Sequence, residues 1–267
     1  MLEMTVDGPV AHVEFNRPEK LNAMGPDFWN RMVPLFREID ADTAIRAVVV
    51  SGRGRGFTAG LDLVAMMATM PIQPGPPDGA RQARLHQLIR DMQAAITAVE
   101  RCRVPVIAAV HGPCIGGGVD FITACDVRLA AADARFGVRE TKLAMVADVG
   151  TLQRLPGIVG PGIARELVFT GRDFDAAYAE HIGLVNRVLP DREAVLAEAL
   201  RVAREIAANP PLAVQGAKRV FNEAVRYDID RGLEYVATWN AAHLVSQDLG
   251  VAVTAFVTKQ KPEFSGR

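Results

Sequence analysis

The sequence predicts an α/β protein, and two observations support this. Up to about residue 190, short apolar runs rich in β-branched residues alternate with stretches in which apolar residues recur at helical spacing. From about residue 192 onward the pattern is helical, with little strand signal. Because strands separated by helices are joined by right-handed crossovers, we expect a mostly parallel sheet in the first part of the chain.

The expected strands are short apolar segments that end at turn residues. They cover residues 10–15, 47–50, 104–110 and 127–131. Apolar residues at helical spacing predict a helix over 26–39 and a longer amphipathic helix over 81–101. Proline and glycine in residues 70–79 exclude regular structure. They predict a loop that either covers a pocket or serves as a surface connector.

The last part of the chain is expected to hold only helices. Their predicted ranges are 192–208, 212–226, 230–247 and 249–260, with Pro210 and Pro211 separating the first two. Such helices need an apolar surface to cover. We therefore divide the chain into residues 1–191 and residues 192–267.

Bulk properties exclude several classes of function. The chain has 267 residues, 49% hydrophobic and 23% charged, and its net charge of −1 gives no electrostatic argument for nucleic acid or an anionic membrane. Cys102, Cys114 and Cys125 lack metal or disulfide spacing, and the five histidines form no metal pattern. We expect no metal site, no membrane span and, without a recognisable organelle address at either end, a cytoplasmic location.

Three carboxylates follow a glycine turn. The run Ile115-Gly-Gly-Gly-Val-Asp120 comes directly after an expected strand, and Glu140 and Asp148 lie a short distance further along the chain. A turn that exposes backbone N–H groups beside acids is suited to chemistry on an acyl carbonyl compound. Taken singly, Asp120 is better explained as an acid stabilised by a helix dipole, and Glu140 is equally well explained by a surface pair with Arg139. An unpaired Asp148 in apolar sequence is costly without a role.

Several motifs resemble the crotonase (enoyl-CoA hydratase/isomerase) superfamily over nearly the whole chain. They are Asn16-Arg-Pro-Glu-Lys-Leu-Asn22, Phe57-Thr-Ala-Gly-Leu-Asp62, Pro105-Val-Ile-Ala-Ala-Val-His-Gly112 with Gly116-Gly-Gly118, and Lys261-Pro-Glu-Phe-Ser-Gly-Arg267. One branch, the Δ3,5-Δ2,4-dienoyl-CoA isomerases, is resembled by Ile115–Asp120, Ala147–Pro156 and Ala237-Thr-Trp-Asn240. The resemblance implies a crotonase-type ββα spiral core with the acyl-CoA site in residues 1–191. It also implies a helical C-terminal trimerisation region in residues 192–267.

The resemblance also implies roles for individual residues. The backbone N–H groups of Leu61 and Gly117 would form an oxyanion hole. The substrate would be bound by Ala59, Gly60, Asp62 and Gly116. The catalytic acids would be Asp120, Glu140 and Asp148. Hydratases of the superfamily hold a water between two glutamates at the positions of the first two acids. A third acid at the position of Asp148 is a feature of the isomerase branch.

The function implied is isomerisation of 3,5-dienoyl-CoA to 2,4-dienoyl-CoA in fatty-acid β-oxidation. It would need no metal and no cofactor, because coenzyme A is part of the acyl-CoA thioester substrate. The expected assembly is a homo-oligomer, either a trimer or a dimer of trimers. One alternative is an enoyl-CoA hydratase that uses Asp120 and Glu140. Another is a non-catalytic RNA- or protein-binding member of the fold, against which the near-neutral charge and the three acids argue.

Overall fold

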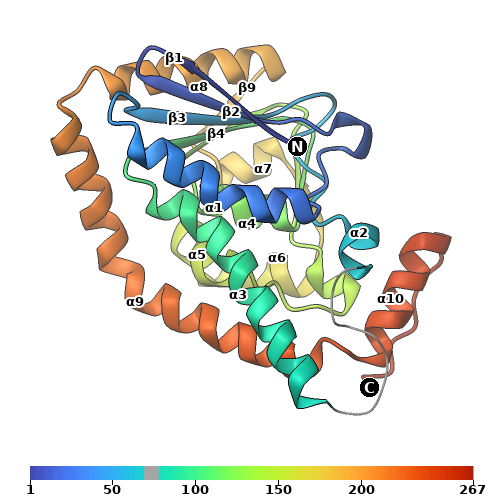
Figure 1. Cartoon of the computed structure of the whole chain (residues 1–267). Coiled ribbons are helices and arrows are strands. Elements are labelled where there is room, and N and C mark those ends of the chain that lie inside the picture. The colour runs from blue at the N-terminus through green and yellow to red at the C-terminus, as the bar shows by residue number, and fades with distance from the viewer. Residues whose placement is uncertain (69–77, 267) are drawn as a thin grey trace.

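A computed structural model of the chain describes residues 1–68 and 78–266. Among these residues, six strands form one sheet in the order β1 (Leu2–Asp7), β2 (Val10–Phe15), β3 (Ala47–Gly52), β4 (Val106–Val110), β6 (Val127–Ala131) and β9 (Arg187–Leu189) (Figure 1). The first two strands form an antiparallel hairpin, and every later pair is parallel. The predicted α/β class and mostly parallel sheet are confirmed. Residues 70–77 of the loop expected over 70–79 lie outside the described residues.

Helices cover both faces of this sheet (Figure 1). Alternate side chains explain the two layers, since Val48 and Val50 face one side while Ala47 and Val49 face the other. The first face packs against α1 (Pro26–Ala41), α3 (Gly79–Arg101) and α4 (Gly117–Thr123), and the second packs against α8 (Arg192–Ala207). The sheet is buried on both sides, and so its strands are continuous apolar runs.

A second, smaller sheet follows the glycine turn. It contains β5 (Pro113–Ile115), β7 (Arg135–Gly137) and β8 (Asp173–Asp175). The remaining short elements are η1 (Pro18–Lys20), α2 (Leu63–Met67), η2 (Glu140–Leu143), α5 (Thr151–Val159), α6 (Pro161–Thr170) and α7 (Ala176–His181). Three-residue strands have too little periodicity to be found in the sequence, and their location depends on pairing with distant segments.

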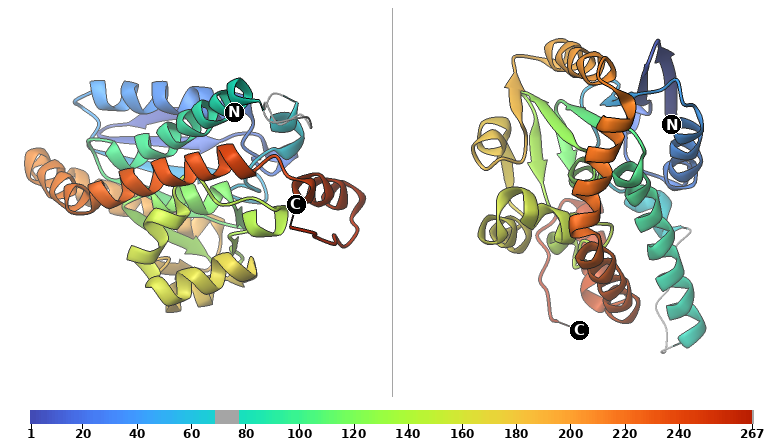
Figure 2. Two further views of the ribbon diagram at one scale, coloured as in Figure 1. Left: turned by 90° about the horizontal axis from the view of Figure 1, so that it is seen from below. Right: turned by 90° about the vertical axis from the view of Figure 1, so that its left-hand side faces the viewer.

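The C-terminal part is helical as predicted, with one correction. The expected break between residues 226 and 230 is absent, because α9 (Pro211–His243) is a single helix. No glycine or proline interrupts it there, and the buried Ile229 and Leu233 continue its apolar spacing across the predicted break. Helix α9 runs beside α3 (Figure 2), and α10 (Gln247–Thr258) follows it. In the described residues no single helix is long and apolar enough to cross a bilayer; only α9 and α10 together, bent by 88°, meet that criterion by length and composition.

Candidate active site

The segment 57–62 is held between two other parts of the chain. Phe57 N donates to the backbone of the segment before β5 at 2.8 Å, and Thr58 N donates to the backbone of β5 itself at 2.9 Å. On its other side, Met24 N donates to Gly60 O at 2.7 Å, and Asp62 N donates to Met24 O at 3.1 Å. Because backbone groups alternate in direction along an extended segment, Leu61 N–H points away from Met24.

The N–H groups of Leu61 and Gly117 lie close together with no protein acceptor in the described part of the chain. A Cβ built on Gly117 would lie 3.9 Å from Leu61 N, and one built on Gly60 would lie 3.4 Å from Gly117 N. Gly117 begins α4, so its N–H is among those that a helix leaves unpaired. The pair therefore provides two adjacent donors for an oxyanion.

Two glycines are required for this approach. Gly60 has φ +87°, and a Cβ there would lie 2.5 Å from Ile115 O. Gly116 has φ +53°, and a Cβ there would lie 3.1 Å from Glu140 Oε1. Both positions favour glycine by backbone conformation, and any side chain would separate the donors or displace the acid.

A cavity of about 140 Å³ opens at these donors and is mostly apolar. Its lining includes all three predicted catalytic acids, Asp120, Glu140 and Asp148. The described lining residues are Trp29, Ala59, Gly60, Leu61, Leu63, Ile89, Met92, Ile115, Gly116, Gly117, Asp120, Arg139, Glu140, Leu143, Met145, Val146, Asp148, Val149, Asn240, Leu244 and Phe256. The acids are separated along the sequence but are brought together by the fold.

Asp120 lies in the first turn of α4 and is only 1% exposed. Its Oδ1 accepts a hydrogen bond from Thr151 N, the first residue of α5, at 2.6 Å. Burial raises the pKa of its carboxyl to about 6, although the Thr151 N hydrogen bond and the Arg154 charge oppose this. Asp120 thus lies in the first turn of α4 and also contacts the N-terminus of α5.

Glu140 begins η2 at the edge of the cavity. Its Oε2 is buried and has no hydrogen-bond partner among the described residues. Burial, together with the charges of Asp120 and Asp148, raises the pKa of Glu140 to about 8. The alternative of a surface pair with Arg139 is wrong, because Arg139 instead pairs with Asp173. A carboxyl that changes charge near neutral pH is suited to proton transfer.

Asp148 lies in the loop before α5. Asn240 Nδ2 of α9 donates to its Oδ2 at 2.7 Å. Burial raises the pKa of Asp148 to about 7; the Asn240 hydrogen bond opposes this rise and the charge of Asp120 adds to it. Three acids that titrate near neutral pH around one apolar cavity form a candidate acid–base site.

The predicted substrate-binding residues are not all in the cavity. Ala59, Gly60 and Gly116 line it, but Asp62 does not. The Asp62 carboxylate receives a hydrogen bond from Arg17 at 2.7 Å and caps α2 by accepting from Ala65 N. Asp62 therefore fixes the end of the donor segment and is not in the lining.

Sequence reasoning missed the contribution of the C-terminal helices. Asn240 and Leu244, at the end of α9, and Phe256 of α10 all line the cavity. The cavity therefore draws on both sides of the proposed boundary at residues 191 and 192. The available signal for Asn240 was its place in the motif at 237–240. The long separation of Asn240 from Asp148 hid their contact.

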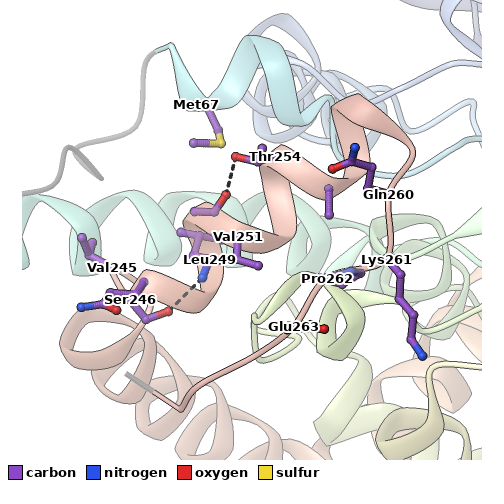
Figure 3. A pocket seen from close by; sticks show the side chains of 13 residues that line it. Met67, Val245, Ser246, Leu249, Val251, Thr254, Gln260, Lys261, Pro262 and Glu263 are labelled. Carbon is purple, nitrogen blue, oxygen red and sulfur yellow. Dashed lines mark hydrogen bonds between the residues drawn. The ribbon is translucent and has the colours of Figure 1, made fainter.

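A second hollow, of about 960 Å³, lies between α10 and the segment at 260–263 (Figure 3). In Figure 3 Ser246 caps α10 by accepting from Leu249 N at 3.1 Å, and Thr254 bonds back to its own helix. None of the three acids lines this hollow. Its size does not make it the chemical site, because the perturbed carboxyls and free donors belong to the smaller cavity.

The remaining candidate ligands have other surroundings. His111 bonds to Gly54 O at 3.0 Å, away from the cavity lining. Cys102, Cys114 and Cys125 are free, buried thiols. Within residues 1–68 and 78–266, no group of three or more His, Cys, Asp or Glu side chains is arranged to hold a metal.

Comparison with known proteins identifies the family. The family model described as enoyl-CoA hydratase/isomerase matches residues 5–267. The chain belongs to the enoyl-CoA hydratase/isomerase family. A crystal structure of a member of this family from Pseudoalteromonas atlantica T6c is 28% identical, covers 99% of each chain and has a TM-score of 0.86. The crotonase fold, with its helical C-terminal part, is therefore confirmed, and membership implies an acyl-CoA substrate.

Two relatives within the enoyl-CoA hydratase/isomerase family are especially similar. The mitochondrial Δ3,5-Δ2,4-dienoyl-CoA isomerase of Dictyostelium discoideum is 45% identical over 96% of this chain and 87% of its own length. The peroxisomal protein of the same name from Arabidopsis thaliana is 42% identical over 99% of this chain and 96% of its own length. A short-chain-enoyl-CoA hydratase of Clostridium acetobutylicum is less similar, at 34% identity over 96% of this chain and 94% of its own length.

Proposed function

We propose that this chain is a Δ3,5-Δ2,4-dienoyl-CoA isomerase that acts in fatty-acid β-oxidation. The observation that carries the proposal is the third carboxylate, Asp148, which lines the same apolar cavity as Glu140 and the donor pair. Hydration needs two acids around one water, whereas a shift of two double bonds needs a proton removed at one carbon and delivered at another. The identity of 42–45% to the two dienoyl-CoA isomerases supports the same conclusion.

The proposed mechanism has two proton transfers. Glu140 as carboxylate removes a proton from C2, and the electrons move into a dienolate whose negative charge reaches the thioester oxygen. Leu61 N–H and Gly117 N–H donate to that oxygen and stabilise it. Asp148 as the acid then delivers a proton to C6, which leaves double bonds at C2 and C4. One proton is lost and one is gained, so the substrate and product are isomers.

Asp120 has a supporting role in this proposal. Its Oδ1 accepts from Thr151 N, and its charge raises the pKa of Glu140. It therefore strengthens Glu140 as a base through its charge. Before the next turnover, the proton on Glu140 must leave and Asp148 must regain one.

A spectroscopic assay tests the function directly. The conjugated 2,4-dienoyl product absorbs where the 3,5-dienoyl thioester does not, so we expect absorbance to rise on adding the protein. In D₂O the product should also carry deuterium at C6, because the proton delivered there comes from an exchangeable acid. No rise in absorbance with 3,5-dienoyl-CoA, together with rapid hydration of a 2-enoyl-CoA, would establish the hydratase alternative.

The assembly and location are also proposals. We propose a trimer or a dimer of trimers, because α9 and α10 leave large apolar side chains exposed, including Phe221 at 75% and Tyr235 at 69%. Sedimentation at micromolar concentration tests this, and a monomeric mass would contradict it.

We propose a cytoplasmic location. The three cysteines are free thiols, which is consistent with a reducing compartment. The two relatives above are named mitochondrial and peroxisomal, and cell fractionation tests the difference.

A further inference from the structure

Asn240 connects α9 to the loop that carries Asp148. Its Nδ2 donates to Val146 O at 2.9 Å and to Asp148 Oδ2 at 2.7 Å. Asn240 is 2% exposed and lines the cavity. Both partners are acceptors, so only one orientation of the amide satisfies them. One buried amide group therefore fixes the backbone and the side chain of the same short loop.

A second amide holds the same residue from another helix. Gln93 of α3 is also 2% exposed, and its Nε2 donates to Asp148 O at 2.7 Å and to Leu233 O at 2.9 Å. Gln93 thus fixes the Asp148 backbone between α3 and α9. With the backbone held by Gln93, the direction of the Asp148 carboxylate is left to Asn240.

We propose that Asn240 is a positioning residue that aims the Asp148 carboxylate and favours its ionised form, and so sets how strongly Asp148 holds the proton destined for C6. The inference deepens the proposed function and rests on the role given there to Asp148. An amide N–H can donate to a carboxylate oxygen but gains less from a protonated one. Asn240 thereby makes Asp148 a stronger acid than its buried surroundings alone would allow.

Two other influences on the Asp148 carboxyl oppose Asn240, namely burial and the charge of Asp120, while a backbone hydrogen bond at Asp148 itself lowers its pKa as Asn240 does. Asp120 of α4 raises the pKa of Asp148 by its charge, as burial does. The charge of Asp148 in turn raises the pKa of Glu140 of η2. Arg139 lines the cavity but is paired with Asp173. The charge of Arg154 of α5 lowers the pKa of Asp120. Among the described residues, Asn240 is the side chain that hydrogen-bonds to the Asp148 carboxylate.

The first test is the pH dependence of turnover in Asn240→Leu, which keeps the approximate size and removes the donor. Glu140 must be ionised and Asp148 protonated, so above the pKa values of both groups, about 8 and about 7, activity falls with the protonated fraction of Asp148. We expect this alkaline limb to move upward by about one pH unit, because without the Asn240 donor burial and the Asp120 charge raise the pKa of Asp148 further. Because the thioester contacts remain, kcat should fall more than KM changes.

Asn222→Leu is the matched control. Asn222 lies on the same helix and donates through Nδ2 to a backbone carbonyl, Glu100 O, at 2.8 Å. It is outside the cavity lining. We expect its pH profile to match the wild type. Equal shifts in both variants would mean a general effect of α9 and would overturn the inference.

A second measurement does not depend on activity. In protein labelled with ¹³C at the aspartate carboxyl carbons, the Asp148 signal is the one absent from Asp148→Asn. Its titration midpoint should move to higher pH in Asn240→Leu. If that variant fails to fold, Asn240→Ser, whose hydroxyl is too short to reach both acceptors, should give a smaller shift of the same sign. An unchanged midpoint overturns the inference even if the protein isomerises dienoyl-CoA, and a shifted midpoint in a protein without isomerase activity would refute only the proposed function.

Discussion

Thr151 N donates a hydrogen bond to Asp120 Oδ1 at 2.6 Å. This contact places the acid that follows the glycine turn against the N-terminus of α5, 31 residues further along the chain. The N-terminus of a helix carries partial positive charge, which favours the carboxylate. Asp120 is consequently anchored, and in the proposed mechanism it acts through its charge on Glu140.

Asp120→Asn keeps an acceptor for Thr151 N and removes that charge. Because the Asp120 charge raises the pKa of Glu140, the variant should have a lower Glu140 pKa. Glu140 must be ionised to act as the base, so below the pKa values of Glu140 and Asp148 activity rises with the ionised fraction of Glu140. We expect the acid limb of the kcat/KM profile for dienoyl isomerisation to move to lower pH. An unchanged limb would contradict the assigned coupling, and selective loss of water addition would favour the hydratase alternative.

Gly117→Pro removes one of the two proposed oxyanion donors. Proline suits the first position of a helix, so α4 should tolerate it. Loss of one such donor costs about 2.7–4 kcal/mol of transition-state stabilisation, a fall in kcat of roughly 10²–10³-fold. Gly117→Ala is the control, since it keeps the N–H. Its Cβ would lie 3.2 Å from Met24 Sδ, a tight contact that the flexible methionine relieves by a small shift. Full turnover by a folded Gly117→Pro protein would show that Gly117 is not a donor.

Asp148→Asn separates isomerisation from hydration. The asparagine can turn its Oδ1 toward Asn240 Nδ2, so the local structure should persist without the exchangeable proton. We expect dienoyl isomerisation to fall by about 10²–10⁴-fold, as is typical for a general acid, while any hydration of 2-enoyl-CoA persists. Retention of isomerisation, measured by diene absorbance, would make Asp148 structural.

Glu140→Gln should stabilise the protein at alkaline pH. The folded-state pKa of Glu140 is about 8 against an ordinary value of 4.5. The folded protein therefore binds the Glu140 proton more tightly than the unfolded chain does. The stability that this proton contributes to the wild type is lost as pH rises toward 8. Relative to wild type, the free energy of unfolding of Glu140→Gln should increase between about pH 5 and about pH 9, by more than about 1.4 kcal/mol.

The control for this prediction is an exposed glutamate. Glu38 pairs with Arg31, which lowers its pKa. In that pH range it is ionised in both states, so Glu38→Gln should differ from wild type by a constant amount. Chemical denaturation across the range measures both variants. A flat difference for Glu140→Gln would mean that the folded protein does not raise this pKa.

The sequence determined the elements whose signals are local. Continuous β-branched runs fixed the central strands, because strands buried on both faces need apolar residues at every position. The glycine turn was also evident, since the positive φ at Gly116 favours glycine. The three acids stood out by residue type, but their roles in proton transfer were implied only by the family resemblance.

Only the tertiary structure decided how the site is completed. The two free N–H groups of Leu61 and Gly117 are adjacent because the segment at 57–62 is bonded on both sides to distant backbone. Asn240 reaches Asp148 across 92 residues of sequence, and Asp62 turns to Arg17 and to α2. Such contacts depend on burial and pairing between remote segments, and residue periodicity carries no record of which remote partner a buried polar group will find.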